Sequence, residues 1–332
     1  MLIKSFIENL LLAVGGITVF LYGLKLMSEN VQTLAGGKMK KLLSSATGSR
    51  VKGVAAGAAV TAVIQSSTAT SIMLAGFVNT GVIDLVRVVP VIMGANIGTT
   101  VTAQLVSLSG SALFDVTAIG SLAAFAGFLA TFSSRRAFSV AGGVTLGFGL
   151  IFIGLEIMNE SVYSFGNYAF FRRMFTASNP FILMLNGFLI TGIVQSASAV
   201  SSVMIVLAGS GVINFESSAY LILGTNIGAG MATLFVSASM GAEAKKVAIA
   251  NVAFNVIGMM ITIAPLMLFE KPTAAFFASL GGGIERQVAN FHSLFNVAVT
   301  LVLLPFVKPF VKLVDKLCNA KLFRWKRAIK AA

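Results

Sequence analysis

Seven apolar segments, each about as long as a membrane-spanning helix, constrain what this chain can fold into. An α-helix needs about 20 apolar residues to cross the hydrocarbon core of a bilayer. Only 11% of the 332 residues are charged, under half of the share that a water-covered domain carries. The sequence therefore predicts an all-α polytopic membrane protein. The segments are residues 6–28, 88–108, 113–132, 138–158, 218–238, 247–268 and 287–307.

Basic side chains gather in the short loops and at the C-terminal end. The formal net charge is +13, and short loops rich in Lys and Arg tend to stay cytoplasmic. If all four basic groups are inside, the segments alternate with the N-terminus outside, although Arg172 and Arg173 count against this orientation. Because no basic face stands clear of the bilayer, the charge indicates a membrane surface and argues against nucleic-acid binding. The groups are residues 38–52, 135–136, 245–246 and 308–330.

The chain contains one cysteine, Cys318, and one histidine, His292. A single cysteine excludes an internal disulfide and a multi-Cys metal site. A single histidine argues against a His-based transition-metal site and against a Ser-His-Asp triad. We therefore expect a protein that is not an enzyme and that needs no cofactor.

Several stretches of the sequence recur later in the chain. The recurrences share nearly one register, which indicates an internal duplication. The pairs are 65–70 with 195–200 and 94–98 with 224–228, both 130 residues apart, and 23–31 with 154–162 at an offset of 131.

The two copies are predicted to lie in opposite orientations. Three predicted spans separate equivalent points of the copies, and an odd number of crossings turns the second copy upside down. Inverted repeats are common among secondary transporters and place the binding site near the bilayer midplane. We predict a first repeat at 1–137, a second at 138–308 with extra C-terminal spans, and a basic amphipathic tail at 309–332 on the cytoplasmic membrane surface.

Each copy also contains an apolar stretch with polar residues in its middle. The stretches at 53–84 and 180–214 are too long for one span and too short for two. A continuous lipid-facing helix would bury unpaired polar groups in hydrocarbon, which is costly. We therefore predict two re-entrant hairpins of two half-helices each, with a Gln-Ser motif at each tip. Inverted copies would bring the tips in from opposite faces, where they can meet.

The predicted tips have chemistry that suits an anion together with Na⁺. The N-terminus of each returning half-helix offers free backbone N–H groups and a positive dipole end, which favour an anion. Hydroxyl, amide and backbone carbonyl oxygens suit Na⁺. Asn96 and Asn226 are each flanked by glycines, whose conformational freedom predicts a broken or unwound point in the span after each hairpin.

The paired Gln-Ser motifs, each followed 29 residues later by Gly-x-Asn-Ile-Gly, resemble those of the sodium–phosphate cotransporter family. Residues 248–255 and 289–296 are also similar to that family's A-x-x-H/N-x-x-F-N helices. The resemblance covers residues 10–307 and implies Na⁺-coupled symport of inorganic phosphate in the plasma or inner membrane. Many bacterial relatives carry a soluble C-terminal regulatory domain, and we expect none after the basic tail.

The resemblance also implies which residues bind the ions. Two departures stand out: Ala197 removes a hydroxyl that the family usually has, and Val200 stands where the first copy has Thr70, so the two halves need not bind ions equally. The phosphate site would comprise Gln65, Ser66, Ser67, Thr68, Gln195, Ser196 and Ser198. The sodium sites would comprise Gln65, Thr68, Asn96, Thr99, Gln195, Ser198, Thr225 and Asn226.

Other functions stay open from the sequence. The coupled anion could be arsenate or a dicarboxylate, and a sensor or scaffold that binds phosphate without transporting it would carry the same motifs. An intramembrane lipid-pyrophosphate phosphatase would need a carboxylate, an Arg and a His or Ser together at the midplane, and the sequence shows no such cluster. The expected partners are phosphate, Na⁺ and the lipid bilayer, with a homodimer as an allowed assembly.

Overall fold

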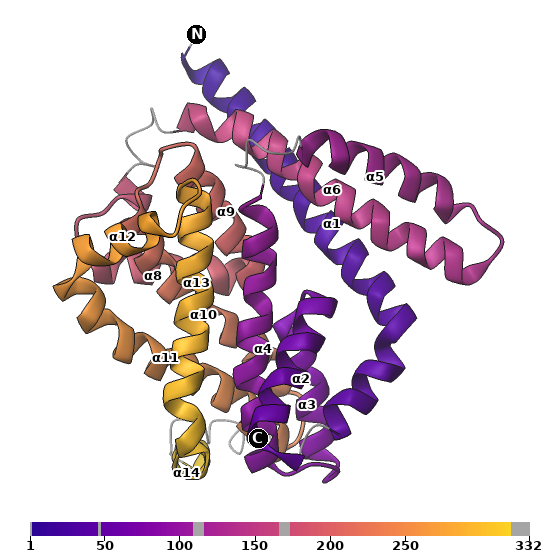
Figure 1. Cartoon of the computed structure of the whole chain (residues 1–332), viewed down its shortest axis with the longest axis vertical. Coiled ribbons are helices and arrows are strands. Elements are labelled where there is room, and N and C mark those ends of the chain that lie inside the picture. The colour runs from indigo at the N-terminus through magenta and orange to yellow at the C-terminus, as the bar shows by residue number, and fades with distance from the viewer. Residues whose placement is uncertain (1, 46–47, 109–115, 166–172, 320–332) are drawn as a thin grey trace, which may run out of the picture.

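The computed structural model describes residues 2–45, 48–108, 116–165 and 173–319. Within these ranges the regular structure is entirely helical, so the all-α prediction is confirmed (Figure 1). The helices are α1 (Leu2–Ser45), α2 (Arg50–Ile64), α3 (Ser67–Asn79), α4 (Leu85–Val106), α5 (Val116–Thr131), α6 (Arg136–Phe165), α8 (Pro180–Val194), α9 (Ala197–Gly209), α10 (Phe215–Ser237), α11 (Ala242–Leu268), α12 (Glu270–Ser279), α13 (Ile284–Leu303), η2 (Leu304–Phe306) and α14 (Val307–Asn319).

Six helical runs in the described part of the chain are long and apolar enough to cross a membrane. They lie in α1, α4, α6, α10, α11 and the run from α13 through α14, and they make the chain a multi-pass membrane protein. The remaining predicted span, 113–132, begins outside the described residues and continues as α5. Helix α1 extends far beyond the predicted 6–28 because it continues through the basic group as far as Ser45.

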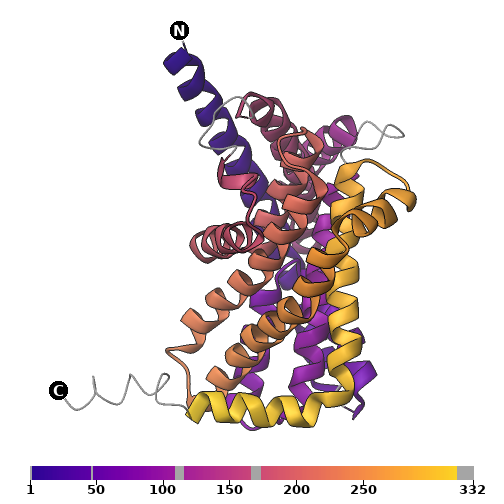
Figure 2. The same ribbon diagram turned by 90° about the vertical axis from the view of Figure 1, so that its left-hand side faces the viewer.

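The helices form two groups. An arm of α1, α5 and α6 projects from a bundle that contains the other helices (Figure 1). Within the bundle, α13 runs from α12 at one end to α14 at the other, and α14 lies across that end (Figure 2). Residues 309–319 of the predicted amphipathic tail belong to α14, whereas residues 320–332 lie outside the described part. Helix α14 packs on α4 and α11, and its buried residues are Val307, Phe310, Val311 and Val314.

Glycines let α1 and α6 approach each other closely along the arm. A Cβ on Gly16 would meet Gly154 O at 3.0 Å, and a Cβ on Gly23 would meet Gly147 O at 2.8 Å. Because the contact moves backward along α6 as it moves forward along α1, the two helices run antiparallel. In the register of the 131-residue offset, Gly16 is equivalent to Gly147 and Gly23 to Gly154. Each contact is therefore the repeat equivalent of the other: replacing both glycines of one contact by their equivalents gives the other contact.

The segments at 53–84 and 180–214 each fold as a helical hairpin. Gly53 lies against Pro90 and Gly98 against Thr61, so α2 and α4 run parallel. Since α4 starts shortly after α3 ends, α3 returns the chain to the end of the bundle at which α2 began. Helices α8, α9 and α10 repeat this arrangement, with Gly187 against Leu221 and Gly228 against Thr191.

The prediction of a broken or unwound span at each Gly-x-Asn-Ile-Gly stretch was wrong. Helices α4 and α10 continue through these stretches without interruption. Their glycines serve close packing instead: a Cβ on Gly94 would collide with Val54 O of α2, and a Cβ on Gly224 with Met184 O of α8. Glycine spacing alone does not distinguish a helix that opens from a helix that another backbone approaches.

Candidate functional site

Two glutamines interrupt the two hairpins in the same conformation. Gln65 caps the C-terminus of α2, with φ 60° and ψ 22°, and Gln195 caps that of α8, with φ 57° and ψ 22°. They are the only non-glycine residues with positive φ in the described part of the chain. This left-handed conformation costs about 1–2 kcal/mol for a residue that has a Cβ. Its occurrence at two equivalent positions marks both as specified features of the fold.

A serine follows each glutamine and caps the next half-helix. Ser66 Oγ accepts a hydrogen bond from Ala69 N at 3.1 Å, and Ser196 Oγ accepts one from Ala199 N at 3.4 Å. Such caps satisfy one of the free N–H groups at a helix N-terminus and leave others available. One helix therefore ends and another begins at each Gln-Ser motif.

The other residues predicted for phosphate lie in the first turns after these breaks. Ser67 and Thr68 are half-buried at the start of α3, and Ser198 is buried at the start of α9. Ser196 Oγ and Ser198 Oγ are 3.5 Å apart. Each half of the predicted phosphate set is thus assembled locally at one break.

Hydrogen bonds surround the first break. Thr102 of α4 donates from Oγ1 to Gln65 Oε1 at 2.6 Å, and Gln65 Nε2 donates to Ala62 O. Thr61 donates from Oγ1 to Thr70 Oγ1 at 3.0 Å, and this hydroxyl donates in turn to Ser66 O at 3.1 Å. The first glutamine is consequently buried, with both ends of its amide engaged.

The second break lacks these bonds. Gln195 is exposed, and the residue equivalent to Thr102 is Ala232. Thr191, the equivalent of Thr61, is fully buried, and its Oγ1 has no hydrogen-bond partner among the described residues. Its counterpart across the break is Val200, which offers no hydroxyl.

The two motif asparagines hold helices together. Asn96 donates from Nδ2 to Asn251 Oδ1 at 2.9 Å and accepts on Oδ1 from Asn255 Nδ2 at 3.2 Å, which joins α4 to α11. Asn226 donates to Ile222 O of its own helix at 2.9 Å, so its Oδ1 faces His292 Nε2 of α13 at 3.3 Å. Since an amide oxygen only accepts, His292 donates from Nε2.

The remaining residues predicted for sodium are also buried. Thr99 donates to Ala95 O at 3.1 Å within α4. Thr225 is fully buried in α10, and its Oγ1 has no hydrogen-bond partner in the described part of the chain. The structure therefore places Asn96, Thr99, Thr225 and Asn226 inside helix packing, and of these Thr225 presents a hydroxyl with no hydrogen-bond partner.

The two halves meet through crossed packing. Helix α3 of the first hairpin packs on α10 and α11, and helix α9 of the second hairpin packs on α4 as well as on α13 of its own half. Within the described residues, no side-chain hydrogen bond joins one break directly to the other. Each returning half-helix thus lies against the opposite half of the molecule.

Sequence reasoning missed several partners of the motif residues. Asn251 and His292 occupy equivalent places in the two A-x-x-H/N-x-x-F-N stretches, so their shared spacing was a usable signal for contact with Asn96 and Asn226. Thr102 carries no such signal because nothing local distinguishes it from any threonine in an apolar helix.

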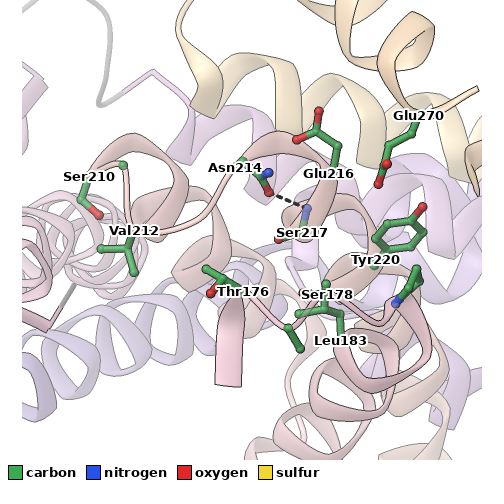
Figure 3. Close-up of a pocket in the computed structure, with 13 residues that line it drawn as sticks. Thr176, Ser178, Leu183, Ser210, Val212, Asn214, Glu216, Ser217, Tyr220 and Glu270 are labelled. Carbon is green, nitrogen blue, oxygen red and sulfur yellow. Dashed lines mark hydrogen bonds between the residues drawn. The ribbon is translucent and has the colours of Figure 1, made fainter. Parts of the chain in front are cut away.

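A cavity of about 760 Å³ lies away from both breaks, at the base of the second hairpin (Figure 3). Its lining comes from four parts of the chain: the segment before α8 with the start of α8, the α9–α10 turn, α10 and α12. None of the predicted site residues lines it. The lining residues are Thr176, Ala177, Ser178, Pro180, Leu183, Ser210, Gly211, Val212, Asn214, Glu216, Ser217, Tyr220 and Glu270.

Known proteins resemble the chain over most of its length. YqeW of Bacillus subtilis, named only as an uncharacterised protein, is 28% identical over 308 residues, which cover 92% of this chain and 97% of YqeW. YjbB of Escherichia coli, whose name proposes inorganic phosphate export, is 26% identical over 309 residues. That match covers 92% of this chain, which spans 55% of YjbB.

A shorter match links the chain to an animal protein. The sodium-dependent phosphate transport protein 2A of Rattus norvegicus is 33% identical over 100 residues, which cover 29% of this chain and 16% of the rat protein. No solved structure matches the chain.

A family model also matches the chain in two long segments. The model described as Na⁺/Pi-cotransporter matches residues 19–160 and 169–284, which include both hairpins and the spans that follow them. Because this match covers well over half of the sequence, the chain belongs to the Na⁺/Pi-cotransporter family, a family of phosphate transporters.

Proposed function

We propose that the chain is a secondary active transporter that moves inorganic phosphate together with Na⁺. The observation that carries the proposal is the recurrence of one break geometry: a left-handed glutamine, then a serine that caps a new half-helix. Helix N-termini of this kind suit a phosphate group. The name of the rat relative, a sodium-dependent transport protein, supports Na⁺ as the coupling ion.

Phosphate would bind to the free N–H groups of the two first turns and to the hydroxyls beside them. In this proposal Gln65, Ser66, Ser67 and Thr68 act at the first break, and Gln195, Ser196 and Ser198 act at the second. Sodium would bind the oxygen atoms of Gln65, Thr68, Thr99, Gln195, Ser198 and Thr225. Asn96 and Asn226 would contribute through the second lone pair of each amide oxygen, since the first is engaged.

Alternating access would follow from two repeats inserted in opposite senses, with the hairpins re-entrant in the bilayer. The antiparallel contact of the equivalent helices α1 and α6 supports this arrangement, as does its mirrored set of glycine contacts. The crossed packing of α3 on α10 and of α9 on α4 would let one half rock against the other.

The test is uptake of radiolabelled phosphate into proteoliposomes. An inward Na⁺ gradient should drive accumulation, and replacing external Na⁺ with choline should abolish it. Gln65→Ala, Ser66→Ala and Gln195→Ala should each lower uptake by at least about tenfold, because each removes a polar group at a break. Thr33→Ala, on the exposed surface of α1, is the matched control and should keep full uptake.

Equal uptake in Na⁺ and in choline would refute the coupling. Full uptake by Gln65→Ala and Gln195→Ala, with normal protein yield, would refute the site. Excess arsenate or a dicarboxylate as competitor tests the anion: only competitors that the carrier also moves should depress phosphate uptake.

The name of YjbB favours export, and a symporter moves its substrates in either direction. Reversing the gradient decides the point. Vesicles loaded with phosphate and Na⁺ should release phosphate faster into choline medium than into Na⁺ medium if coupling is reversible. Release at equal rates, together with gradient-driven uptake, would indicate a carrier that is kinetically one-way.

A further inference from the structure

The cavity at the base of the second hairpin carries negative charge. It lies at the end of the bundle near α12, opposite α14 (Figures 1 and 3). Glu216 of α10 and Glu270 of α12 both line it, and none of the described residues that line it is Lys, Arg or His. We propose that this cavity is a second cation site, a vestibule that binds Na⁺ apart from the two hairpin breaks.

Uncharged oxygen atoms accompany the two carboxylates. Ser217 is 8% exposed and lines the cavity. Its hydroxyl has no hydrogen-bond partner among the described residues, whereas its backbone N–H donates to Asn214 Oδ1 at 2.9 Å. The Tyr220 hydroxyl faces the Glu270 carboxylate, and the charge of Glu216 acts on it as well. Within the described part of the chain, the Ser217 hydroxyl opens on the cavity without a protein partner, so its oxygen is available to a cation held beside the two carboxylates.

The equivalent place in the first repeat has the opposite charge. In the 130-residue register, Val86 stands for Glu216 and Arg87 for Ser217. Arg87 pairs with Asp84 at 3.2 Å, and Arg50 lies at the start of α2. The two ends of a duplicated structure have thus diverged in charge, although their backbones remain alike.

Helix dipoles alone do not account for the acidic lining. Glu216 and Glu270 each lie in a first helical turn, where a carboxylate is favoured by the dipole. The equivalent helix α4 carries its carboxylate at the N-cap, Asp84, whereas α10 has Asn214 at the N-cap and Glu216 in its first turn. The dipole thus accounts for one carboxylate at the start of each helix, and it does not explain why Glu216 and Glu270 of two different helices line one cavity.

The donor set fits a monovalent, oxygen-seeking ion. Within the described residues, no group of three or more His, Cys, Asp or Glu side chains could hold a metal ion. Two carboxylates with hydroxyls and space for water suit weakly held Na⁺, while tight Ca²⁺ sites use more carboxylate ligands. Phosphate would be repelled by the same charges. The choice of Na⁺ among monovalent ions rests on the proposed function.

Such a vestibule would raise the local Na⁺ concentration at one end of the transporter. Clefts lined by one sign of charge concentrate counter-ions by about tenfold or more. The Na⁺ requirement of transport would then depend partly on residues that never touch phosphate.

The experiment measures equilibrium binding of ²²Na⁺ to the full chain in nanodiscs, without phosphate, with choline keeping the ionic strength constant. Glu216→Gln/Glu270→Gln removes both carboxylates, and Ser217→Ala removes the hydroxyl. Glu29→Gln/Glu160→Gln is the control, because it neutralises two exposed carboxylates on α1 and α6. Gln65→Ala/Gln195→Ala disables the breaks and leaves the cavity intact.

We expect the cavity double variant to lose a Na⁺-binding component or weaken it about tenfold. Ser217→Ala should weaken it less, and the control should match the unmodified chain. The Gln65→Ala/Gln195→Ala variant should retain the component. Excess K⁺ should compete weakly.

Unchanged ²²Na⁺ binding in Glu216→Gln/Glu270→Gln would overturn the vestibule and leave Na⁺-coupled transport standing. Displacement by micromolar Ca²⁺ would overturn the assignment to a monovalent ion. If phosphate uptake proves independent of Na⁺ while cavity binding is lost in the double variant, the vestibule stands and the proposed coupling fails. Should the double variant misfold, Glu216→Gln and Ser217→Ala singly give the same comparison.

Discussion

The two breaks share a backbone and differ in what surrounds it. At the first, Gln65 is buried and hydrogen-bonded to Thr102; at the second, Gln195 is exposed, and Ala232 stands where that threonine would be. Both glutamines nevertheless have nearly identical φ and ψ. The conformation of the break therefore depends on its glutamine and serine and on glycine-mediated packing of the flanking helices. The polar side chains around the break can differ without changing it. We infer that the second break is the looser of the two.

Substitution of the glycines that pack the helices in the same way in both hairpins should have the largest effects on stability. Gly94→Ala and Gly224→Ala each place a Cβ against a carbonyl oxygen of the parallel helix. Both should lower stability by about 1–3 kcal/mol or more, since neither backbone can withdraw easily. The thermal unfolding midpoint in detergent and the yield of folded protein measure this.

Gly192→Ala is the matched control, because nothing lies within 4 Å of its added Cβ. It should be neutral or raise stability by about 0.5–1 kcal/mol, as alanine does within a helix. If Gly94→Ala behaves like Gly192→Ala, the close contact of α2 with α4 is absent. A large effect at Gly94 alone would mean that the two hairpins are not packed alike.

The difference in exposure should appear as a difference in chemical reactivity. In a Cys318→Ala background, Gln195→Cys should react with a small water-soluble methanethiosulfonate at least about tenfold faster than Gln65→Cys, since access limits thiol reactions. Labelling over time, followed by mass spectrometry, gives both rates. Equal rates would place both glutamines in the same environment and remove the distinction between a closed first break and an open second one.

The smallest effects should come from exchanging the hydroxyls across the breaks. Thr70→Val removes the hydrogen bond that the buried Thr61 hydroxyl donates, at a cost of about 1 kcal/mol. Val200→Thr offers the unpaired Thr191 hydroxyl a partner, for a gain of up to about 1 kcal/mol. Unfolding midpoints of the two variants should move in opposite directions. A loss of stability in Val200→Thr would show that the second break has no room for the missing bond.

The sequence alone was sufficient to predict where the helices break, because local composition determines those positions. Polar residues in the middle of apolar stretches predicted the breaks at Gln65 and Gln195, and the recurrence of the motifs predicted that the breaks would be alike. The prediction that the helices open at Asn96 and Asn226 was wrong. A pair of glycines can either let a helix unwind or let another backbone pack closely against it, and only the position of a neighbouring helix decides which occurs. The Gln65–Thr102 bond and the acidic cavity depend on segments far apart in the chain, so no local pattern marked them.

The contact between α1 and α6 has a consequence for the origin of the chain. Gly16 contacts Gly154, and Gly23 contacts Gly147. Since Gly16 is equivalent to Gly147 and Gly23 to Gly154, the same two positions of each repeat form both contacts. Two-fold dimers of identical subunits have interfaces of this isologous kind. Two separate chains of half the length that paired about a two-fold axis would form the same seam. Fusion would then have joined a homodimer into one polypeptide, after which each half was free to change its charges and hydroxyls independently.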